Sequence, residues 1–131
     1  MRPGFHSISP YLIVRGASAA IEFYKQAFGA TERMRVPSPE PGKLMHSELE
    51  IGDSQVMMAD EFPEMGYLSP LSLGKSPVGF MLYVDDADAV YAQAIAAGAK
   101  SIAAMADKEY GRTGIVEDPS GYQWYVTTHR P

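Results

Sequence analysis

The same apolar motif occurs twice in this chain, at positions 70 residues apart, and this internal repeat restricts the fold more than any other feature. Residues 12–17 and 82–87 each combine the end of an apolar strand, a short turn and the start of a helix. A glycine follows each predicted helix, at Gly29 and Gly98, where a left-handed residue can close the last turn. The repeat therefore predicts two copies of one supersecondary unit.

Three strand-like runs follow each predicted helix. In chain order they cover about residues 31–36, 44–51, 55–59, 101–105, 114–117 and 123–128. Tight turns at 52–54 and 118–121, rich in Gly, Asp, Pro and Ser, separate the last two runs of each copy. The order βαβββ–βαβββ predicts an α+β fold with mostly antiparallel sheets and one helix packed on each repeat.

The length of 131 residues fits a single domain that needs no metal or disulfide merely to fold. Repeat one is expected over about residues 8–60 and repeat two over about 77–129. A Pro-, Gly- and Ser-rich loop at about 61–76 links them. We therefore expect one domain over residues 1–131.

Composition removes several classes of function. The chain has no cysteine, which excludes disulfides, thiolate metal sites and cysteine nucleophiles. Its net charge is −5, and its lysines and arginines are scattered singly, so no nucleic-acid surface is predicted. No apolar run approaches the ~20 residues of a membrane span, and residues 1–10 do not resemble a secretory signal. We expect a cytoplasmic protein that binds neither nucleic acid nor membrane.

Period-two alternation assigns one face of each strand to the helix and leaves the other face open. The residues predicted for the open faces as ligand-binding candidates are Ser9, Tyr11, Met58, Asp60, Met81, Tyr83 and Tyr125. Such a face is apolar with a few polar groups, as small-molecule pockets are. The alternative is that it packs against a partner subunit or a loop.

Several strings in both halves are similar to motifs of the vicinal oxygen chelate superfamily, which includes glyoxalase I, bleomycin-resistance proteins and extradiol dioxygenases. They are YLIV at 11–14, AIEFY at 20–24, FGA at 28–30, YVDD at 83–86 and EDPSGY at 117–122. The strings HSEL at 46–49 and MADEFP at 58–63 resemble the PhnB-like branch. The resemblance implies that the repeats form a curved sheet cup around a small-molecule ligand. It also implies a homodimer, because the βαβββ units pair edge to edge within or between chains.

The resemblance further implies four metal-ligand positions of the His/Glu type, two in each repeat. On this sequence they fall on Ser9, Met58, Gly79 and Tyr125, none of which is a histidine or a carboxylate. Serine and tyrosine are weak ligands unless deprotonated, methionine suits soft ions and glycine offers no side chain. We therefore expect no metal at the family positions, which argues against the glyoxalase and dioxygenase mechanisms.

A different site is conceivable on the run 44–51. His46, Glu48 and Glu50 alternate along it and share one face, and Asp60 on the next strand could join them around one divalent ion. His46 could instead act as a metal-free general base oriented by Glu48, which makes these two residues the catalytic candidates. The alternative is a solvated polar face of a sheet.

Two hypotheses of function follow. The first is a protein without a cofactor that holds a small, partly apolar organic molecule in a Tyr- and Met-rich cup. The second is a metal-dependent lyase, isomerase or dioxygenase with a displaced site at His46, Glu48 and Asp60. A third possibility is that the open face is an interface and that ligand function has been lost. Whether the protein is an enzyme stays open at this stage.

Overall fold

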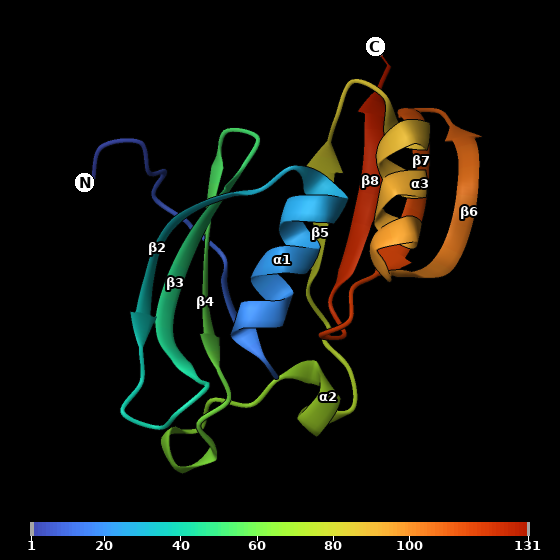
Figure 1. The fold of residues 1–131 in the computed structure, drawn as a ribbon. Coiled ribbons are helices and arrows are strands. Elements are labelled where there is room, and N and C mark those ends of the chain that lie inside the picture. The colour runs from blue at the N-terminus through green and yellow to red at the C-terminus, as the bar shows by residue number, and fades with distance from the viewer. Residues whose placement is uncertain (1, 131) are drawn as a thin grey trace.

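The computed structural model describes residues 2–130, which form two βαβββ halves (Figure 1). The first half contains β1 (Tyr11–Val14), α1 (Ala17–Phe28), β2 (Thr31–Pro37), β3 (Leu44–Ile51) and β4 (Ser54–Asp60). The second contains β5 (Gly79–Tyr83), α3 (Ala87–Ala97), β6 (Lys100–Lys108), β7 (Gly111–Glu117) and β8 (Gln123–His129). The linker carries η1 (Pro63–Met65) and α2 (Pro70–Leu73). The predicted α+β fold with one helix per repeat is confirmed.

Each half forms its own four-stranded open sheet, with strand orders β1-β4-β3-β2 and β5-β8-β7-β6. The pairs β1–β4 and β5–β8 are parallel, and the other pairs are antiparallel. The register repeats as well: Tyr11 pairs with Met57 in the first sheet, and Met81 pairs with Tyr125 in the second. Met57 is therefore the residue of the first half that corresponds to Tyr125.

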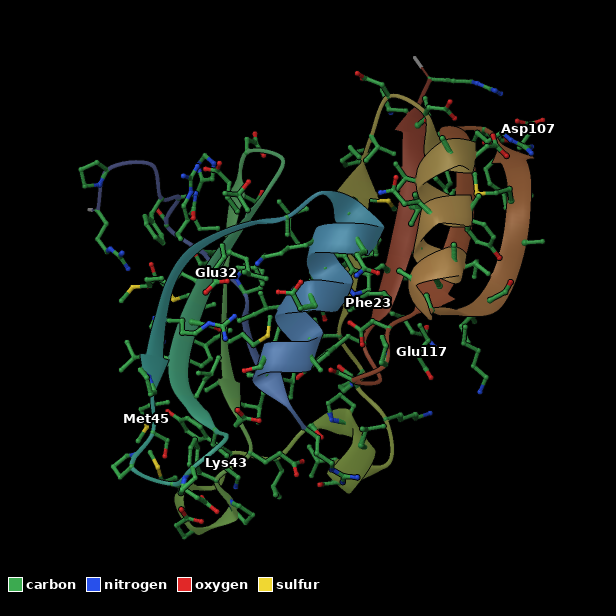
Figure 2. All side chains as sticks on the ribbon, viewed as in Figure 1. Phe23, Glu32, Lys43, Met45, Asp107 and Glu117 are labelled. Carbon is green, nitrogen blue, oxygen red and sulfur yellow. The ribbon has the colours of Figure 1, made fainter. Side chains whose placement is uncertain are left out.

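The core joins the two halves through α1, which lies between the strands of the first half and those of the second (Figure 1). Phe23 lies on the side of α1 that faces the second half (Figure 2). The ring of Phe28 lies 4.8 Å from that of Trp124 in β8, between centroids. Gln93 of α3 donates a hydrogen bond of 2.9 Å to the carbonyl of Ala27 in α1. The helices thus bury their apolar stripes against each other as well as against their own sheets.

A buried carboxylate also links the halves. Asp118 accepts hydrogen bonds from the hydroxyl of Tyr24 and, at 2.9 Å, from the indole of Trp124. The backbone N–H groups of Ser120 and Tyr122 complete its partners at 2.9 and 3.0 Å. Burial raises the pKa of Asp118, and these hydrogen bonds to its charged form oppose that effect.

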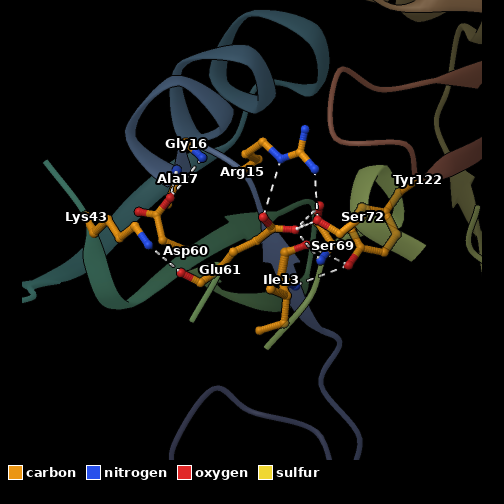
Figure 3. Close-up of polar contacts among 10 residues, drawn as sticks. All are labelled: Ile13, Arg15, Gly16, Ala17, Lys43, Asp60, Glu61, Ser69, Ser72 and Tyr122. Atoms are coloured by element: carbon orange, nitrogen blue, oxygen red, sulfur yellow. Dashed lines mark hydrogen bonds and ion pairs between the residues drawn. The ribbon is translucent and has the colours of Figure 1, made fainter. Parts of the chain in front are cut away.

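The linker is fastened to the start of α1 by Glu61 (Figure 3). The Glu61 carboxylate accepts hydrogen bonds of 2.6 Å from the hydroxyls of Ser69 and Ser72. Arg15, just before α1, donates to the Ser72 hydroxyl at 2.8 Å. Hydrogen bonds from Ser69 are the largest cause that lowers the pKa of Glu61 to about 2. The predicted loop is therefore an ordered connection.

The predicted faces of β4 are wrong. Met58 is fully buried in the core opposite Leu12, on the helix side of the sheet. Asp60 is on the same side: one carboxylate oxygen accepts from the N–H groups of Gly16 and Ala17 at 2.8 and 2.9 Å (Figure 3). Residues 56–59 are all apolar, so alternation gave no signal for the correct register.

None of the helices described within residues 2–130 is long and apolar enough to cross a bilayer.

Candidate functional site

The open face of the first sheet carries the polar candidates. Strand pairing places His46 and Glu48 of β3 on the same face as Tyr11 of β1 and Met57 of β4. Met34 of β2 pairs with Glu48 and adds an exposed thioether. The prediction that His46 and Glu48 share a strand face is confirmed by their direct hydrogen bond.

Four side chains on this face form one hydrogen-bonded chain, here called the polar chain: Tyr11, His46, Glu48 and Arg2. The hydroxyl of Tyr11 lies 2.9 Å from Nδ1 of His46. Nε2 of His46 lies 2.8 Å from Oε2 of Glu48. Arg2 then donates two hydrogen bonds to the Glu48 carboxylate, at 2.8 and 2.9 Å. Two of these residues, Tyr11 and His46, lie 35 positions apart in the sequence.

The charge on Glu48 sets the direction of the polar chain. The hydrogen bond from Arg2 is the main cause that lowers the pKa of Glu48 to about 2, against the burial that alone would raise it. The carboxylate is therefore ionised at neutral pH and accepts the Nε2–H of His46. In a neutral imidazole, Nδ1 is then the acceptor for the Tyr11 hydroxyl. Burial is the largest cause that raises the pKa of Tyr11, so the phenol keeps its proton.

This arrangement can hold or move a proton at a defined atom. A histidine whose Nε2–H is held by a carboxylate presents a basic Nδ1, as in general-base catalysis. Here Nδ1 faces the hydroxyl of Tyr11, a residue that is 44% exposed. A ligand on the open face could therefore exchange a hydrogen bond or a proton with Tyr11.

The family's metal does not fit the corresponding residues. Ser9 lies in the irregular segment before β1 and is half-buried. A Cβ at Gly79 would lie 2.6 Å from Cε1 of Tyr125, so the tyrosine ring covers this position. The residue that corresponds to Tyr125 in the first half is Met57, a thioether that suits soft ions.

The displaced metal site is not formed either. Asp60 lies on the helix side of β4, whereas His46 and Glu48 lie on the open face, so these three side chains do not converge. Over residues 2–130, no group of three or more His, Asp or Glu side chains is arranged to hold a metal ion. The carboxylate of Asp60 instead serves three backbone N–H groups, those of Gly16, Ala17 and Leu44.

The open face of the second sheet is mostly apolar. Met81, Tyr83 and Tyr125 share it as predicted, and Met81 and Tyr83 are 44% and 63% exposed. A buried hydroxyl pair, Thr113 and Thr127, lies beneath them with an O–O distance of 2.8 Å. A cavity of about 550 Å³ opens at the end of this face, lined by Tyr83, Val84, Asp85, Thr128 and His129.

Sequence reasoning missed two residues of the candidate site. Arg2 gave no signal, because it lies in an irregular segment 46 positions before Glu48. Met57 was missed because the alternation chosen for this strand predicts Met58 for the open face, which leaves Met57 on the helix side. Within the described residues, neither cavity on an open face is lined by both sheets, so each sheet supplies one wall only.

Comparisons with known proteins agree with this architecture. A sequence profile of the glyoxalase/bleomycin resistance protein/dioxygenase superfamily matches residues 4–126. An uncharacterized protein of Mycobacterium bovis is 43% identical over 122 residues, which cover 90% of this chain and 80% of that protein.

Solved structures share the fold. Protein PA1353 from Pseudomonas aeruginosa superposes with a TM-score of 0.76 at 27% identity, covering 96% of this chain and 99% of that one. A PhnB protein from Bacillus cereus superposes with a TM-score of 0.73 at 16% identity, covering 94% and 99%. The resemblance seen in the sequence is confirmed: the chain belongs to the glyoxalase/bleomycin resistance protein/dioxygenase superfamily.

Proposed function

We propose that this protein binds a small organic molecule in a sheet cup, without a metal at the family positions. The observation that carries the proposal is the make-up of the open faces. Exposed aromatic and thioether side chains (Tyr11, Met81 and Tyr83) lie beside a few fixed polar groups, those of the polar chain and of Thr113 and Thr127. Binding pockets combine apolar area with a small number of placed polar groups in this way.

The proposal includes a homodimer that closes the cup. Each sheet ends in a short strand, β1 or β5, that pairs on one side only. Over residues 2–130, the cavity described on each open face is lined by one sheet only, so a wall from a second copy would complete each of them. Light scattering at micromolar concentration tests this, and a monomer at that concentration would contradict it. The lack of cysteine also favours a cytoplasmic location.

A thermal-unfolding screen of small aromatic and polyol compounds tests ligand binding. A compound present at 100 times its dissociation constant stabilises by about 2.7 kcal/mol, which raises the Tm on the order of 10 °C for a chain of this size. We expect Tyr125→Ala to weaken binding of any hit, because this ring lies on the open face. Leu73→Ala, at an exposed position of α2 in the linker, serves as the control and is expected to leave binding nearly intact. A screen without any shift would argue against the proposal.

A second candidate function, proton-transfer catalysis in the same cup, is favoured by the polar chain alone. Tyr11 and His46 would exchange a proton with the substrate, and Glu48 would hold the imidazole in the reactive tautomer. On this view His46→Ala abolishes turnover of a bound compound while its dissociation constant stays nearly unchanged. Turnover that survives in His46→Ala would remove this candidate.

A further inference from the structure

The segment of residues 2–10 that precedes β1, here called the leading segment, reaches the open face of the first sheet through one residue. The guanidinium of Arg2 binds both oxygens of Glu48 and lies 4.0 Å from the ring centroid of Phe5. Among the described residues, these are the only side-chain hydrogen bonds that join residues 2–8 to a strand. The contact is thus a single polar attachment.

The fold holds the two partners of this contact very differently. The side chain of Glu48 is 4% exposed and that of Arg2 is 56% exposed. Glu48 belongs to a central strand, and His46 holds one of its oxygens independently of Arg2. The carboxylate is therefore a fixed, nearly buried acceptor, and the guanidinium is a group that a second cation can replace without disturbing the sheet.

A cavity of about 360 Å³ opens at this contact, with Arg2, Phe5, Met34 and Glu48 in its wall. This volume falls within the range of small-molecule pockets. The neighbouring carboxylate, Glu50, already has two partners, Arg33 and Gln55. Glu48 is therefore the acidic residue in this wall whose cationic partner, Arg2, comes from outside the sheet.

We propose that Glu48 is a subsite for a cationic ligand group, a guanidinium, amidinium or ammonium, and that Arg2 occupies this subsite until such a ligand displaces it. The inference rests on the proposed function, since it names the charge of one end of the cup's ligand. Carboxylates favour guanidinium and amidinium groups because both can donate two parallel hydrogen bonds. The ring of Phe5 adds a cation–π surface.

Charge decides between a cationic and an anionic ligand. An anion on the remaining N–H groups of the Arg2 guanidinium would lie beside the negative charge of Glu48. An anion that drew Arg2 away would leave a nearly buried carboxylate without its main partner, which is unfavourable. A cation instead exchanges one pair for an equivalent pair and releases Arg2, which is already largely solvated.

The test is calorimetric titration of the full chain with benzamidinium, with neutral benzamide and anionic benzoate as matched compounds. Arg2→Ala removes the internal competitor, so we expect benzamidinium to bind about tenfold more tightly than to the wild type. Arg130→Ala is the matched control, because Arg130 is 55% exposed and pairs with Asp107 in the second half. This variant is expected to bind as the wild type does. Glu48→Gln is expected to abolish the binding.

Each outcome has a defined meaning. Binding to Arg2→Ala no tighter than to the wild type, or an equal gain for benzoate, overturns the proposal. If Glu48→Gln does not fold, the carboxyl carbon resonance of Glu48 in Arg2→Ala replaces it, and an unchanged resonance on adding benzamidinium is also negative. A neutral ligand that depends on Tyr125 but not on Arg2 would support the proposed function and contradict this inference, so the two can fail separately.

Discussion

In the first half, Asp60 at the end of β4 accepts the N–H of Ala17 at 2.9 Å, and in the second half Thr128 at the matching place accepts the N–H of Ala87 at 2.8 Å. On the helix side, the two halves therefore share one feature, a side-chain hydrogen-bond acceptor for the first turn of the helix. The open faces differ. Glu48 pairs with Met57, and Ile115 pairs with Tyr125, so an isoleucine occupies the position of the buried glutamate.

The same register sets His46 against Thr113. One fold thus accepts both a histidine–glutamate pair and a hydroxyl–aliphatic pair at equivalent positions. The fold therefore does not require the polar chain. This supports a role for the polar chain in binding or catalysis and not in folding.

The largest effect is expected from the helix-side acceptors. Asp60→Ala leaves three backbone N–H groups without their acceptor and should cost about 3 kcal/mol of unfolding free energy. Thr128→Ala removes one such contact and should cost about 1 kcal/mol. Urea unfolding measures both, with Asp60→Asn and Thr128→Ser as conservative controls. Equal losses of unfolding free energy in the two alanine variants would contradict the expectation that the loss increases with the number of hydrogen bonds removed.

Exchanging residues between the open faces gives the next effect. Ile115→Glu places a carboxylate in a half-buried position without a built partner and should cost about 2 kcal/mol. Glu48→Ile replaces an ion pair by an aliphatic side chain and should change stability by less than about 1 kcal/mol. Denaturant unfolding at pH 7 compares them. A Glu48→Ile variant that is the less stable of the two would mean that the first sheet needs its carboxylate to fold.

The unfolding free energy at acidic pH also distinguishes the two open faces, because Glu48 titrates and Ile115, at the equivalent position, does not. The pKa of Glu48 falls from 4.5 to about 2 on folding, so its contribution is present above pH 4.5 and is lost as the pH falls toward 2. The difference in unfolding free energy between the wild type and Glu48→Gln should therefore shrink over this window. Glu61 titrates in the same window, and Glu61→Gln provides the reference. A difference that stays constant from pH 6 to 2 would contradict the assigned pKa.

Divalent ions are expected to have the smallest effect. Thermal unfolding with Ni, Mn, Zn, Co and Fe(II) should leave the Tm unchanged, because Asp60 does not reach His46 and Glu48. A bound ion at 100 times its dissociation constant would shift the Tm on the order of 10 °C. A shift of that size that disappears in His46→Ala would place a metal on the open face of the first half only.

The sequence was sufficient where a pattern has a clear period. The repeat predicted both helices and the order of helices and strands along the chain. Period-two alternation correctly placed His46 and Glu48 on one strand face, and Met81 and Tyr125 on the open face of the second half. Alternation failed in the run 56–59, where every residue is apolar. There it predicted Met58 instead of Met57 for the open face.

Two other residues could not be read from sequence for different reasons. A carboxylate at a strand end can bind a ligand or cap the next helix, and only the turn geometry shows that Asp60 caps α1. The approach of Arg2 to Glu48 is a long-range contact of an irregular segment, which no local period reports.

The carboxylate of Asp118 has a consequence for how the two halves unfold. Its hydrogen-bond donors come from both copies of the unit, since Tyr24 lies in the first and Trp124 in the second. A single unit expressed alone would bury this acid without the tyrosine hydroxyl or expose the aromatic cluster around it. The two halves are therefore mutually dependent, and the molecule should unfold as one cooperative unit and not as two independent halves.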